Sequence, residues 1–433
     1  MYFEQKYETM GRDELEQLQL ERLQSTLYRV SRNVPFYRRK FEELSIDPDE
    51  FLDLADLVKL PFTTKADLRE NYPYGMFAVP LREVVRLHAS SGTTGRAVVV
   101  GYTKNDVERW GRLVARVLTA GGAGRDDVVQ VAFAYGMFTG GFGMHYGAET
   151  LGASVIPASA GNTRRQIQII EDYKTTALCC TPSYALHLAG RMIEEEVNPN
   201  SLTLKWGLFG AEVWTENMRA RIEDQLKITA TDNYGLSEIM GPGIAGECLE
   251  RQGLHVNEDH FLAEVIDPDT LDAVEPGETG ELVLTTLTKE AFPMIRFRTG
   301  DLTRLIEEPC PCGRAFKRMG RVMGRTDDMF IIRGINVFPA QVESIVSREH
   351  GAIPQYQIVI EREEGLDKAT VLVEAESDAF FDEIKKHQAA KERMEKSLES
   401  ELGVGFEVKL VEQASLAPDE GEKARRVLDK REL

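Results

Sequence analysis

The sequence lacks a long uncharged apolar segment at its start. Its first residues, "MYFEQKYETMGRDELEQL", carry charges throughout, so we expect no signal peptide. Residues 128–148 are uncharged and reach the roughly 20 residues of a membrane span, but glycines, Gln130 and His145 interrupt that stretch. We therefore expect a cytoplasmic protein without a membrane partner.

Positive charge is also scarce. The chain has 52 lysines and arginines against 71 aspartates and glutamates, a formal net charge of −19. Such a field repels nucleic acids and anionic membranes, so we expect neither as a partner. It does not exclude small phosphate ligands, because a local cluster of N–H groups can outweigh distant charges.

Cysteine is rare as well. Five cysteines, an odd number, in a chain without an export signal favour reduced thiols or a metal site over a disulfide scaffold. Cys179 and Cys180 lie in an apolar run and are expected in the core. A disulfide between Cys310 and Cys312 would be strained, and we expect none.

What the sequence does contain is length: 433 residues exceed what one hydrophobic core usually supports, so we expect two or more domains. From Asp13 to Leu44, apolar residues recur every three or four positions, which predicts helix interrupted at Pro35. From about residue 85 to 240, apolar runs such as "VVQVAFAY", "TALCCTPS" and "WGLFGAE" alternate with helix-like segments. This alternation predicts an α/β fold with mostly parallel sheets covered by helices, and ligand-binding loops after the strands.

The pattern changes near residue 245. Strands and turns then predominate, which predicts a β-rich subdomain over about residues 245–326 of an N-terminal domain that spans residues 1–326. Residues 327–433 read as a small mobile α+β C-terminal domain, with the strands "QYQIVIERE" and "KATVLVEAE" and a charged helix near Phe380 to Leu402.

The stretch "HASSGTTGRAVVVGYT" places glycines and hydroxyl residues between two apolar runs. Glycines let a backbone approach a polyphosphate, and the N–H and O–H groups donate to its oxygens. The stretch lacks the G-x-x-x-x-G-K-[ST] pattern of the other common phosphate loop, and by itself it also fits a surface turn.

The motifs taken together carry a resemblance. "SSGTTGR", followed by "YGLSE", "TGD", "GRTDD" and "EGEKARRVLDKR", resembles the adenylate-forming superfamily of acyl-CoA synthetases. "NVPFYRRKF", "AYGMFTGG", "GLHVNEDHF" and "RTDDMFIIRGINVFP" are similar, in order and spacing, to its phenylacetate–CoA ligase family. The resemblance spans nearly the whole chain. It implies that ATP converts an acid into an acyl-adenylate, releasing pyrophosphate, and that coenzyme A then displaces AMP. The first step gathers negative charge and so needs Mg²⁺ and cations.

The resemblance also implies a set of nucleotide-binding residues. The loop that would hold the β- and γ-phosphates consists of Ser90, Ser91, Gly92, Thr93, Thr94, Gly95 and Arg96. The residues that would flank the adenine are Gly210, Ala211, Glu212, Asn233 and Tyr234. Asp301 would accept hydrogen bonds from the ribose hydroxyls, with Arg325 assisting, and Glu238 would bind Mg²⁺, a hard ion suited to a carboxylate.

Two further roles fall in the C-terminal region. Lys423 in "EGEKARRV" matches the lysine that neutralises the carboxylate and the α-phosphate during adenylation. Asp327 falls at the hinge position of "GRTDDM", so the resemblance implies a small domain that rotates between the two steps.

The motif "AYGMFTGG" suggests the acid. Tyr135 and Phe138 with Gly140 and Gly141 could form a slot for a flat ring, although such aromatics could equally belong to the core. With the resemblance, an aryl or arylacetic acid is expected. Phenylacetate, hydroxyphenyl, indolyl and benzoate analogues stay open.

Four residues point to a second chemistry. Cys248, His255, Cys310 and Cys312 offer three thiolates and one imidazole, a closed tetrahedral set for structural Zn²⁺. The alternative is that these four residues are unrelated.

Three functions are therefore weighed. The first is an AMP-forming acid–CoA ligase, with ATP and coenzyme A as co-substrates, in aromatic compound catabolism. The second is adenylation for another acceptor, either a deazaflavin cofactor or a carrier protein. The third is a non-catalytic nucleotide-binding protein. The family resemblance also suggests a homodimer.

Overall fold

The structure is a computed structural model that describes residues 1–90, 98–326, 330–332, 335–337, 339–350, 355–363, 366–374, 384–412, 415–416 and 426–430. It divides into two compact units. Unit 1 comprises Met1–Glu212 and Arg219–Arg321, and unit 2 comprises Val213–Met218 and Val322–Leu433.

Helices open unit 1. They are α1 (Gln5–Glu8), α2 (Arg12–Asn33), α3 (Pro35–Glu43) and α4 (Lys65–Glu70). Short 3₁₀ helices span Pro48–Glu50, Leu54–Lys59, Leu81–Glu83 and Pro199–Ser201. The predicted break at Pro35 is confirmed: α2 ends two residues earlier, and the proline starts α3, where its missing N–H has no intrahelical partner to lose.

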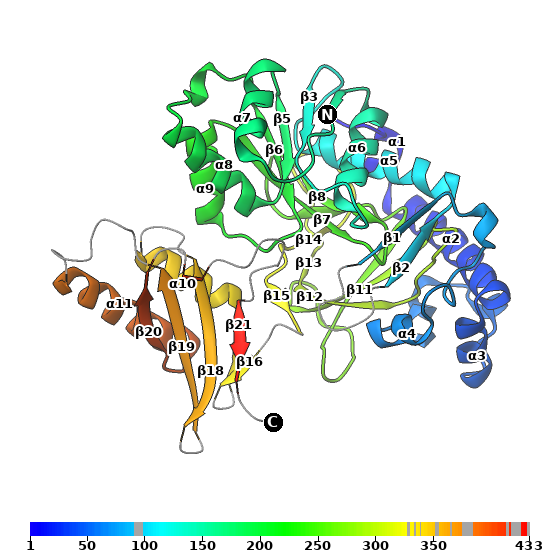
Figure 1. The fold of residues 1–433 in the computed structure, drawn as a ribbon. Coiled ribbons are helices and arrows are strands. Elements are labelled where there is room, and N and C mark those ends of the chain that lie inside the picture. Colours follow the sequence, from blue (N-terminus) through cyan, green and yellow to red (C-terminus); the bar gives the residue numbers. More distant parts are fainter. Residues whose placement is uncertain are drawn as a thin grey trace. The chain divides into compact units, whose positions relative to one another are not determined.

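A large mixed sheet forms the centre of unit 1 (Figure 1). Its strands, in spatial order, are β13 (Leu305–Ile306), β14 (Arg318–Met319), β9 (Leu254–Val256), β8 (Gly241–Glu247), β7 (Thr229–Leu236), β6 (Trp206–Gly210), β5 (Ala177–Cys180), β3 (Val128–Val131) and β4 (Ser154–Ile156). The five strands from β7 to β4 run parallel, while the pairs from β7 to β13 are antiparallel. The predicted α/β class is confirmed, and half of this sheet is antiparallel.

Helices cover both faces of this sheet. They are α5 (Lys104–Ala120), α6 (Gly140–Leu151), α7 (Thr163–Asp172), α8 (Pro182–Glu194) and α9 (Glu216–Leu226). Figure 1 shows α7 and α8 on one side and α5 and α6 on the other. Helix α5 packs closely on β8, because a Cβ at Gly243 or Gly246 would lie within 3.0 Å of Val114 or Val117.

Smaller strand groups complete unit 1. The hairpin that flanks the glycine-rich loop consists of β1 (Arg86–Ala89) and β2 (Val99–Tyr102), with His88 paired to Val100. An antiparallel sheet contains β10 (Phe261–Ile266), β11 (Gly280–Thr286) and β12 (Phe297–Thr303) as consecutive neighbours. These strands lie within the region where β structure was predicted.

Unit 2 has its own core. Its strands are β15 (Gly324–Arg325), β16 (Phe330–Ile332), β17 (Ile335–Val337), β18 (Tyr356–Glu363), β19 (Leu366–Glu374), β20 (Glu407–Val411) and β21 (Val427–Asp429). Its helices are α10 (Pro339–His350) and α11 (Ile384–Leu402). A four-stranded sheet of order β20-β19-β18-β21 packs apolar side chains such as Ile358 and Val371 against Met394 and Leu398 of α11.

Two sequence predictions concern membrane-spanning helices and the cysteines. Among the described helices, none combines the length and the apolar character that a membrane crossing requires. Cys179 and Cys180 are fully buried in β5, as predicted, and all five cysteines are free thiols.

Candidate active site

The loop after β6 brings the predicted adenine residues together. A Cβ at Gly210 would lie 2.3 Å from the backbone oxygen of Asn233 on β7, so only glycine fits this close strand pairing. Asn233 in turn donates its side-chain N–H to the carbonyl of Phe209. Ala211 adopts a left-handed backbone with φ of 69°, which turns the chain away from the sheet at this point. The β6 end and β7 therefore form one rigid rim.

Glu212 fixes this rim to the next helix. Its carboxylate accepts hydrogen bonds from the backbone N–H and the hydroxyl of Ser183, at 3.2 and 2.9 Å. Ser183 lies in the first turn of α8, where backbone N–H groups have no helical partner and favour an anion. The hydrogen bonds to the first turn of α8 therefore fix the position of the Glu212 carboxylate.

Asp301 meets the same rim from another sheet. It lies on β12 and is buried, and Tyr234 of β7 donates its hydroxyl to Oδ2 at 2.5 Å. The backbone N–H of Asp301 donates to the hydroxyl of Thr299 at 3.0 Å. The structure thus joins "YGLSE" and "TGD", which lie 67 positions apart when measured from Tyr234 to Asp301.

Glu238 lies in the turn between β7 and β8. It is only 5% exposed, yet its carboxylate makes no recorded hydrogen bond or ion pair with the described residues. The neighbouring Ser237 shares a hydrogen bond of 2.9 Å with Thr139, which precedes α6. A largely buried carboxylate without a protein partner is costly unless a ligand or ion balances it.

The predicted aromatic slot lies at the start of α6. A Cβ at Gly141 would lie 2.7 Å from the carbonyl oxygen of Ala134, so glycine lets α6 approach the segment that carries Tyr135. The ring of Tyr135 meets that of Phe142 edge-on at 5.2 Å, whereas Phe138 is 38% exposed. A Cβ at Gly140 would meet only the movable ring of Phe138.

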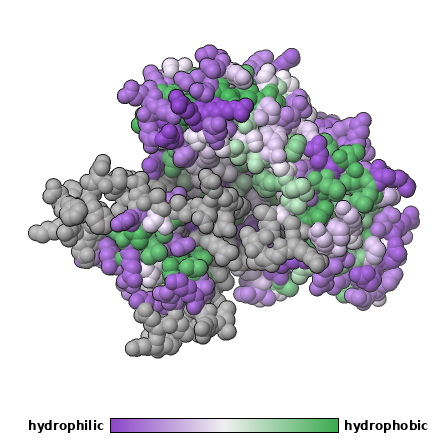
Figure 2. Space-filling view, viewed as in Figure 1, coloured by the Kyte–Doolittle hydropathy of each residue, from purple (hydrophilic) through white to green (hydrophobic). Residues whose placement is uncertain are grey.

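Apolar surface surrounds this region. Exposed apolar side chains near the slot and the β1–β2 hairpin are Val85, Leu87, Met137 and Phe138. The carbonyl of Met137 accepts a hydrogen bond from the backbone N–H of Ala89, which ties the slot segment to β1. Figure 2 shows apolar residues gathered over the part of unit 1 where β1 and β2 lie.

The other predicted site residues lie in different parts of the chain or outside its described part. Ser90 closes the described part of the hairpin with a backbone bond to Val98 at 3.0 Å. Arg325 lies on β15 in unit 2. The residues that lie outside the described part of the chain are Ser91, Gly92, Thr93, Thr94, Gly95, Arg96, Asp327 and Lys423.

The four predicted zinc ligands converge. One ligand atom from each of Cys248, His255, Cys310 and Cys312 lies within 4.8 Å of the others. The Sγ atoms of Cys248 and Cys310 are 3.7 Å apart, and Nε2 of His255 is 3.4 Å from Sγ of Cys312. Residues from the end of β8, from β9 and from the turn after β13 therefore meet at one point.

The protonation of this cluster follows from burial and from His255. Burial raises the pKa of Cys248 to about 12. Burial also acts on Cys312, but hydrogen bonds from His255 and Arg314 lower its pKa to about 5. Nδ1 of His255 lies 3.4 Å from the carbonyl oxygen of Phe316, and this contact orients the ring so that Nε2 faces the thiols.

Sequence reasoning missed two histidines near the site. The hydroxyl of Tyr135 lies 3.2 Å from Nδ1 of His145, whose Nε2 lies 3.2 Å from Glu149. His88 is buried among the rings of Tyr102 and Phe142, and this burial lowers its pKa. The four-residue spacing of His145 and Glu149 was a visible helical signal, whereas the setting of His88 depends on tertiary packing.

The chain matches the models of two protein families and is similar to known ligases. A family model for AMP-binding enzymes matches residues 54–287, and one for the AMP-binding enzyme C-terminal domain matches residues 334–431. The chain is 47% identical to the phenylacetate-coenzyme A ligase of Thermus thermophilus, over 100% of both chains. It is 47% identical to the ligase of the same name from Escherichia coli, over 98% of this chain and 97% of the other.

A solved structure shares the fold. It is the crystal structure of 2-hydroxyisobutyryl-CoA ligase in the postadenylation state with 2-HIB-AMP. The TM-score is 0.91 and the identity 31%, over 99% of this chain and 92% of that one.

Proposed function

This chain belongs to the phenylacetate–coenzyme A ligase family of AMP-binding enzymes, and from that premise we propose that it acts on an aryl or arylacetic acid of the phenylacetate type. It is an AMP-forming acid–thiol ligase that joins its acid to coenzyme A through an acyl-adenylate. The observation that carries this conclusion is 47–48% identity over nearly the full chain to four curated ligases of that one name.

The reaction has two halves. A carboxylate oxygen of the acid attacks the α-phosphorus of ATP, and pyrophosphate leaves with the electron pair of the broken P–O bond. The sulfur of coenzyme A then loses its proton and attacks the acyl carbon, and AMP leaves. Each half develops negative charge on oxygen, so the site must supply fixed donors and cations.

The rim of β6 and β7 supports a nucleotide site. We assign the adenine contact to Gly210, Ala211 and Glu212, with Asn233 and Tyr234 beside them. Asp301 would accept hydrogen bonds from the ribose hydroxyls. The hydrogen bond that it accepts from Tyr234, at 2.5 Å, holds its carboxylate in position for this contact. Arg325 is assigned a supporting role on the ribose.

The phosphates call for positive charge. Glu238 fits a Mg²⁺ ligand, because its buried carboxylate has no partner among the described residues and carboxylate oxygen suits that ion. Bound there with ATP, Mg²⁺ would supply charge neutralisation at the phosphates. The loop from Ser90 to Arg96 would donate to the β- and γ-phosphates, and Lys423 would neutralise the carboxylate and the α-phosphate.

We assign the conformational change between the two half-reactions to unit 2. Lys423 belongs to the first half of the reaction, so it must withdraw before coenzyme A can enter. We place the hinge at Asp327, because a few backbone dihedrals at one position can reorient a whole domain.

The acid would lie at the start of α6. Tyr135 and Phe138 would supply the rings of the slot, while Gly141 lets α6 pack against the segment that carries Tyr135, since a Cβ there would lie 2.7 Å from the carbonyl oxygen of Ala134. His145 contacts the hydroxyl of Tyr135 and is itself paired with Glu149, so the ring is oriented from α6. An apolar slot of this kind favours an unsubstituted ring such as that of phenylacetate.

The cysteine–histidine cluster fits a structural Zn²⁺. Two sulfurs bound to one tetrahedral zinc are separated by about 3.8 Å, given Zn–S bonds of about 2.3 Å. The observed separation of Cys248 and Cys310 is 3.7 Å. With His255 and Cys312 the set offers four ligands and leaves no position for substrate, so the ion would join β8, β9 and the turn after β13 without taking part in the reaction.

Three further assignments complete the proposal. The cytoplasm is the proposed location, because ATP and coenzyme A are supplied there. A homodimer is the proposed assembly, to be checked by sedimentation velocity. Catabolism of aromatic acids is the proposed context, since a thioester is the activated form that further enzymes require.

The decisive experiment is an acid panel. The protein is incubated with ATP, Mg²⁺ and coenzyme A and one acid at a time, and the mass of the thioester is recorded. We expect phenylacetyl-CoA and equimolar AMP. An adenylate trapped by hydroxylamine, without any thioester, would favour another acceptor, such as a carrier protein or a deazaflavin cofactor. ATP binding with neither product would favour a non-catalytic nucleotide-binding protein.

A further inference from the structure

A second cationic cavity lies in unit 1, between α2 and α5. Its volume is about 320 Å³, near the lower end of the roughly 300–1,000 Å³ of small-molecule sites. Its cationic lining consists of Arg22 and Arg29 from α2, Arg109, Arg112 and Arg116 from α5, and Lys289. None of the described residues assigned to ATP, the acid or Mg²⁺ lines it.

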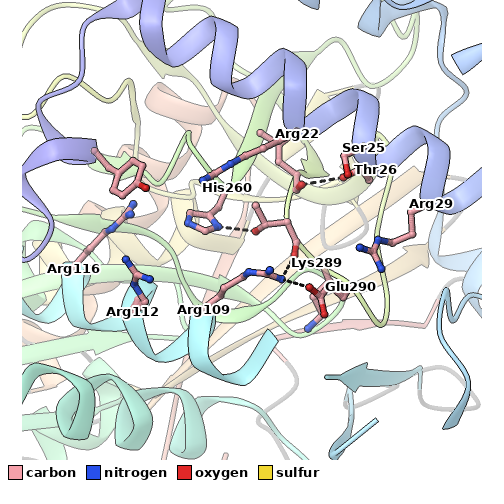
Figure 3. Close-up of a pocket in the computed structure, with 13 residues that line it drawn as sticks. Arg22, Ser25, Thr26, Arg29, Arg109, Arg112, Arg116, His260, Lys289 and Glu290 are labelled. Carbon is pink, nitrogen blue, oxygen red and sulfur yellow. Dashed lines mark hydrogen bonds and ion pairs between the residues drawn. The ribbon is translucent and has the colours of Figure 1, made fainter. Parts of the chain in front are cut away.

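The arginines are arranged in two facing rows. Arg22 and Arg29 are seven positions apart on α2, and so are Arg109 and Arg116 on α5, which places each pair on one helical face. Figure 3 shows Arg109, Arg112 and Arg116 reaching from α5 toward α2. Like charges repel across such a gap, so this convergence costs free energy without an anion.

Protein carboxylates balance only part of this charge. Asp259 pairs with Arg116 at 2.7 Å and with Arg22 at 3.6 Å. Glu290 pairs with Arg109 at 2.9 Å, and Glu4 pairs with Arg112 and Arg116.

Arg29 and Ser25 carry donors that no other residue in the described part of the chain uses. The guanidinium of Arg29 makes no recorded hydrogen bond or ion pair with any described residue, and neither does the hydroxyl of Ser25. Both lie on the same face of α2 and line the cavity. An incoming anion would therefore find unused donors on α2 opposite the arginines of α5.

Lys289 also lines the cavity, but its amine faces Tyr102 and Met240, which do not line it. It is fully buried, with Nζ 3.1 Å from the centre of the Tyr102 ring and 3.7 Å from Sδ of Met240, and it forms no ion pair with a described residue. Burial lowers the pKa of Lys289 to about 7, although Asp106 acts to raise it.

His260 does not compensate the charge. Burial, together with the charges of Arg116 and Arg22, lowers its pKa to about 3 against the opposing effect of Asp259. The ring is therefore neutral, with Nε2 3.3 Å from Asp259 and Nδ1 2.6 Å from the hydroxyl of Thr288.

We propose that this cavity is a second anion site, which binds a small phosphate-bearing molecule between Arg29 of α2 and the arginines of α5. A phosphate group fits better than a single carboxylate, because it carries about two charges and presents oxygens in several directions. Donors approach here from two helices. Guanidinium groups bind phosphate through paired N–H donors, which gives such a site its strength.

The test is calorimetric titration of the full-length protein with inorganic phosphate, at constant ionic strength in chloride. Wild type should bind phosphate saturably. Arg29→Gln and Arg112→Gln should each weaken this binding about tenfold, the effect of losing one hydrogen-bonded charge. Arg32→Gln is the matched control, because Arg32 lies on α2, outside the lining.

The outcomes separate this site from the ATP site. Phosphate that binds only to the active site would be held equally well by the Arg29 and Arg32 variants, which would overturn the proposal. Absence of saturable binding to wild type would overturn it too. All three variants replace partly or fully exposed side chains, and thermal unfolding verifies that each is folded.

Discussion

Tyr234 and Asp301 share a hydrogen bond of 2.5 Å that joins β7 of the large sheet to β12 of the second sheet. Both side chains are buried. Through this bond the groups proposed to contact adenine and ribose are held as one structural unit, since Asn233 and Gly210 lie directly beside Tyr234.

The bond predicts a defect confined to nucleotide binding. Tyr234→Phe removes the hydroxyl but keeps the ring, so Asp301 loses one charge-assisted donor. We expect the KM for ATP to rise about three- to tenfold, with kcat for the acid changed less, because such a bond contributes about 1 kcal/mol. Steady-state kinetics with varied ATP measures this.

Tyr37→Phe is the matched control for that variant. The hydroxyl of Tyr37 is also buried and lies 2.9 Å from the hydroxyl of Thr63, far from the nucleotide rim in the sequence. Its loss should lower the free energy of unfolding and leave the KM for ATP unchanged. Equal KM values for both variants would refute the role given to Tyr234.

Gly141 predicts a change in acid recognition. In Gly141→Ala the new Cβ would lie 2.7 Å from the carbonyl oxygen of Ala134, so α6 or the Tyr135 segment must shift. A shift of this size at a positioned substrate costs up to about a hundredfold in kcat/KM for the acid. The KM for ATP should change little.

Gly190→Ala serves as the control for this substitution. Gly190 lies inside α8, where an added Cβ meets nothing within 4 Å. Alanine there should stabilise the protein by about 0.5–1 kcal/mol and leave the kinetics unchanged. If Gly141→Ala behaves in the same way, the slot does not lie at the start of α6.

The sequence predicted the parallel half of the large sheet but not the antiparallel half. Strands such as β5 are visible in the sequence as short apolar runs bounded by turn residues. Strand β8 has the sequence "GPGIAGE", which resembles that of a loop. Its glycines lack side chains, and this allows α5 to pack closely against the strand. Gly243 even has a positive φ of 100°, a conformation outside normal strand geometry.

The same limit applies to the candidate sites. The family resemblance implied Asp301 and Tyr234 as site residues, and the four-residue cluster around Cys248 was predicted from ligand chemistry. The partner of Asp301 and the setting of Lys289 could not be predicted, because both depend on contacts between distant segments. Arg22 and Arg116 likewise meet at Asp259 only through the packing of distant segments.

The zinc cluster predicts metal content and stability together. Purified protein should contain one zinc per chain by atomic emission, and Cys310→Ala should lose it. Because a structural zinc contributes its binding free energy to folding, the melting temperature should fall in this variant and after chelation. Cys179→Ala, which removes a buried thiol elsewhere, should keep its zinc. Full zinc content in Cys310→Ala would contradict the site.

Lys423 predicts a defect in the first half of the reaction alone. Lys423→Ala should slow pyrophosphate release about 10²- to 10³-fold, since it removes charge stabilisation from the transition state. ATP binding and the transfer of preformed acyl-adenylate to coenzyme A should persist. Lys430→Ala is the control, because Lys430 pairs with Glu361 at 3.0 Å. Normal pyrophosphate release by the Lys423 variant would reject the assignment.

Lys289 predicts how stability depends on pH. The folded pKa is about 7, whereas an exposed lysine titrates near 10.5. Between these values the unfolded chain binds a proton that the folded chain does not, so raising the pH stabilises wild type, by about 1.4 kcal/mol per pH unit. The burial cost is fully present below pH 7 and disappears near pH 10.5. In Lys289→Met this rise should be absent, and the variant should gain most over wild type near pH 7.

Urea unfolding between pH 7 and 9.5, in buffers free of phosphate, measures that difference. The exposed Lys104, at the start of α5, provides the control: Lys104→Met should keep the wild-type slope, because its amine stays in water in both states. Parallel curves for wild type and Lys289→Met would mean that Lys289 is charged in the folded protein at neutral pH. In that case a carboxylate or a retained anion must neutralise it.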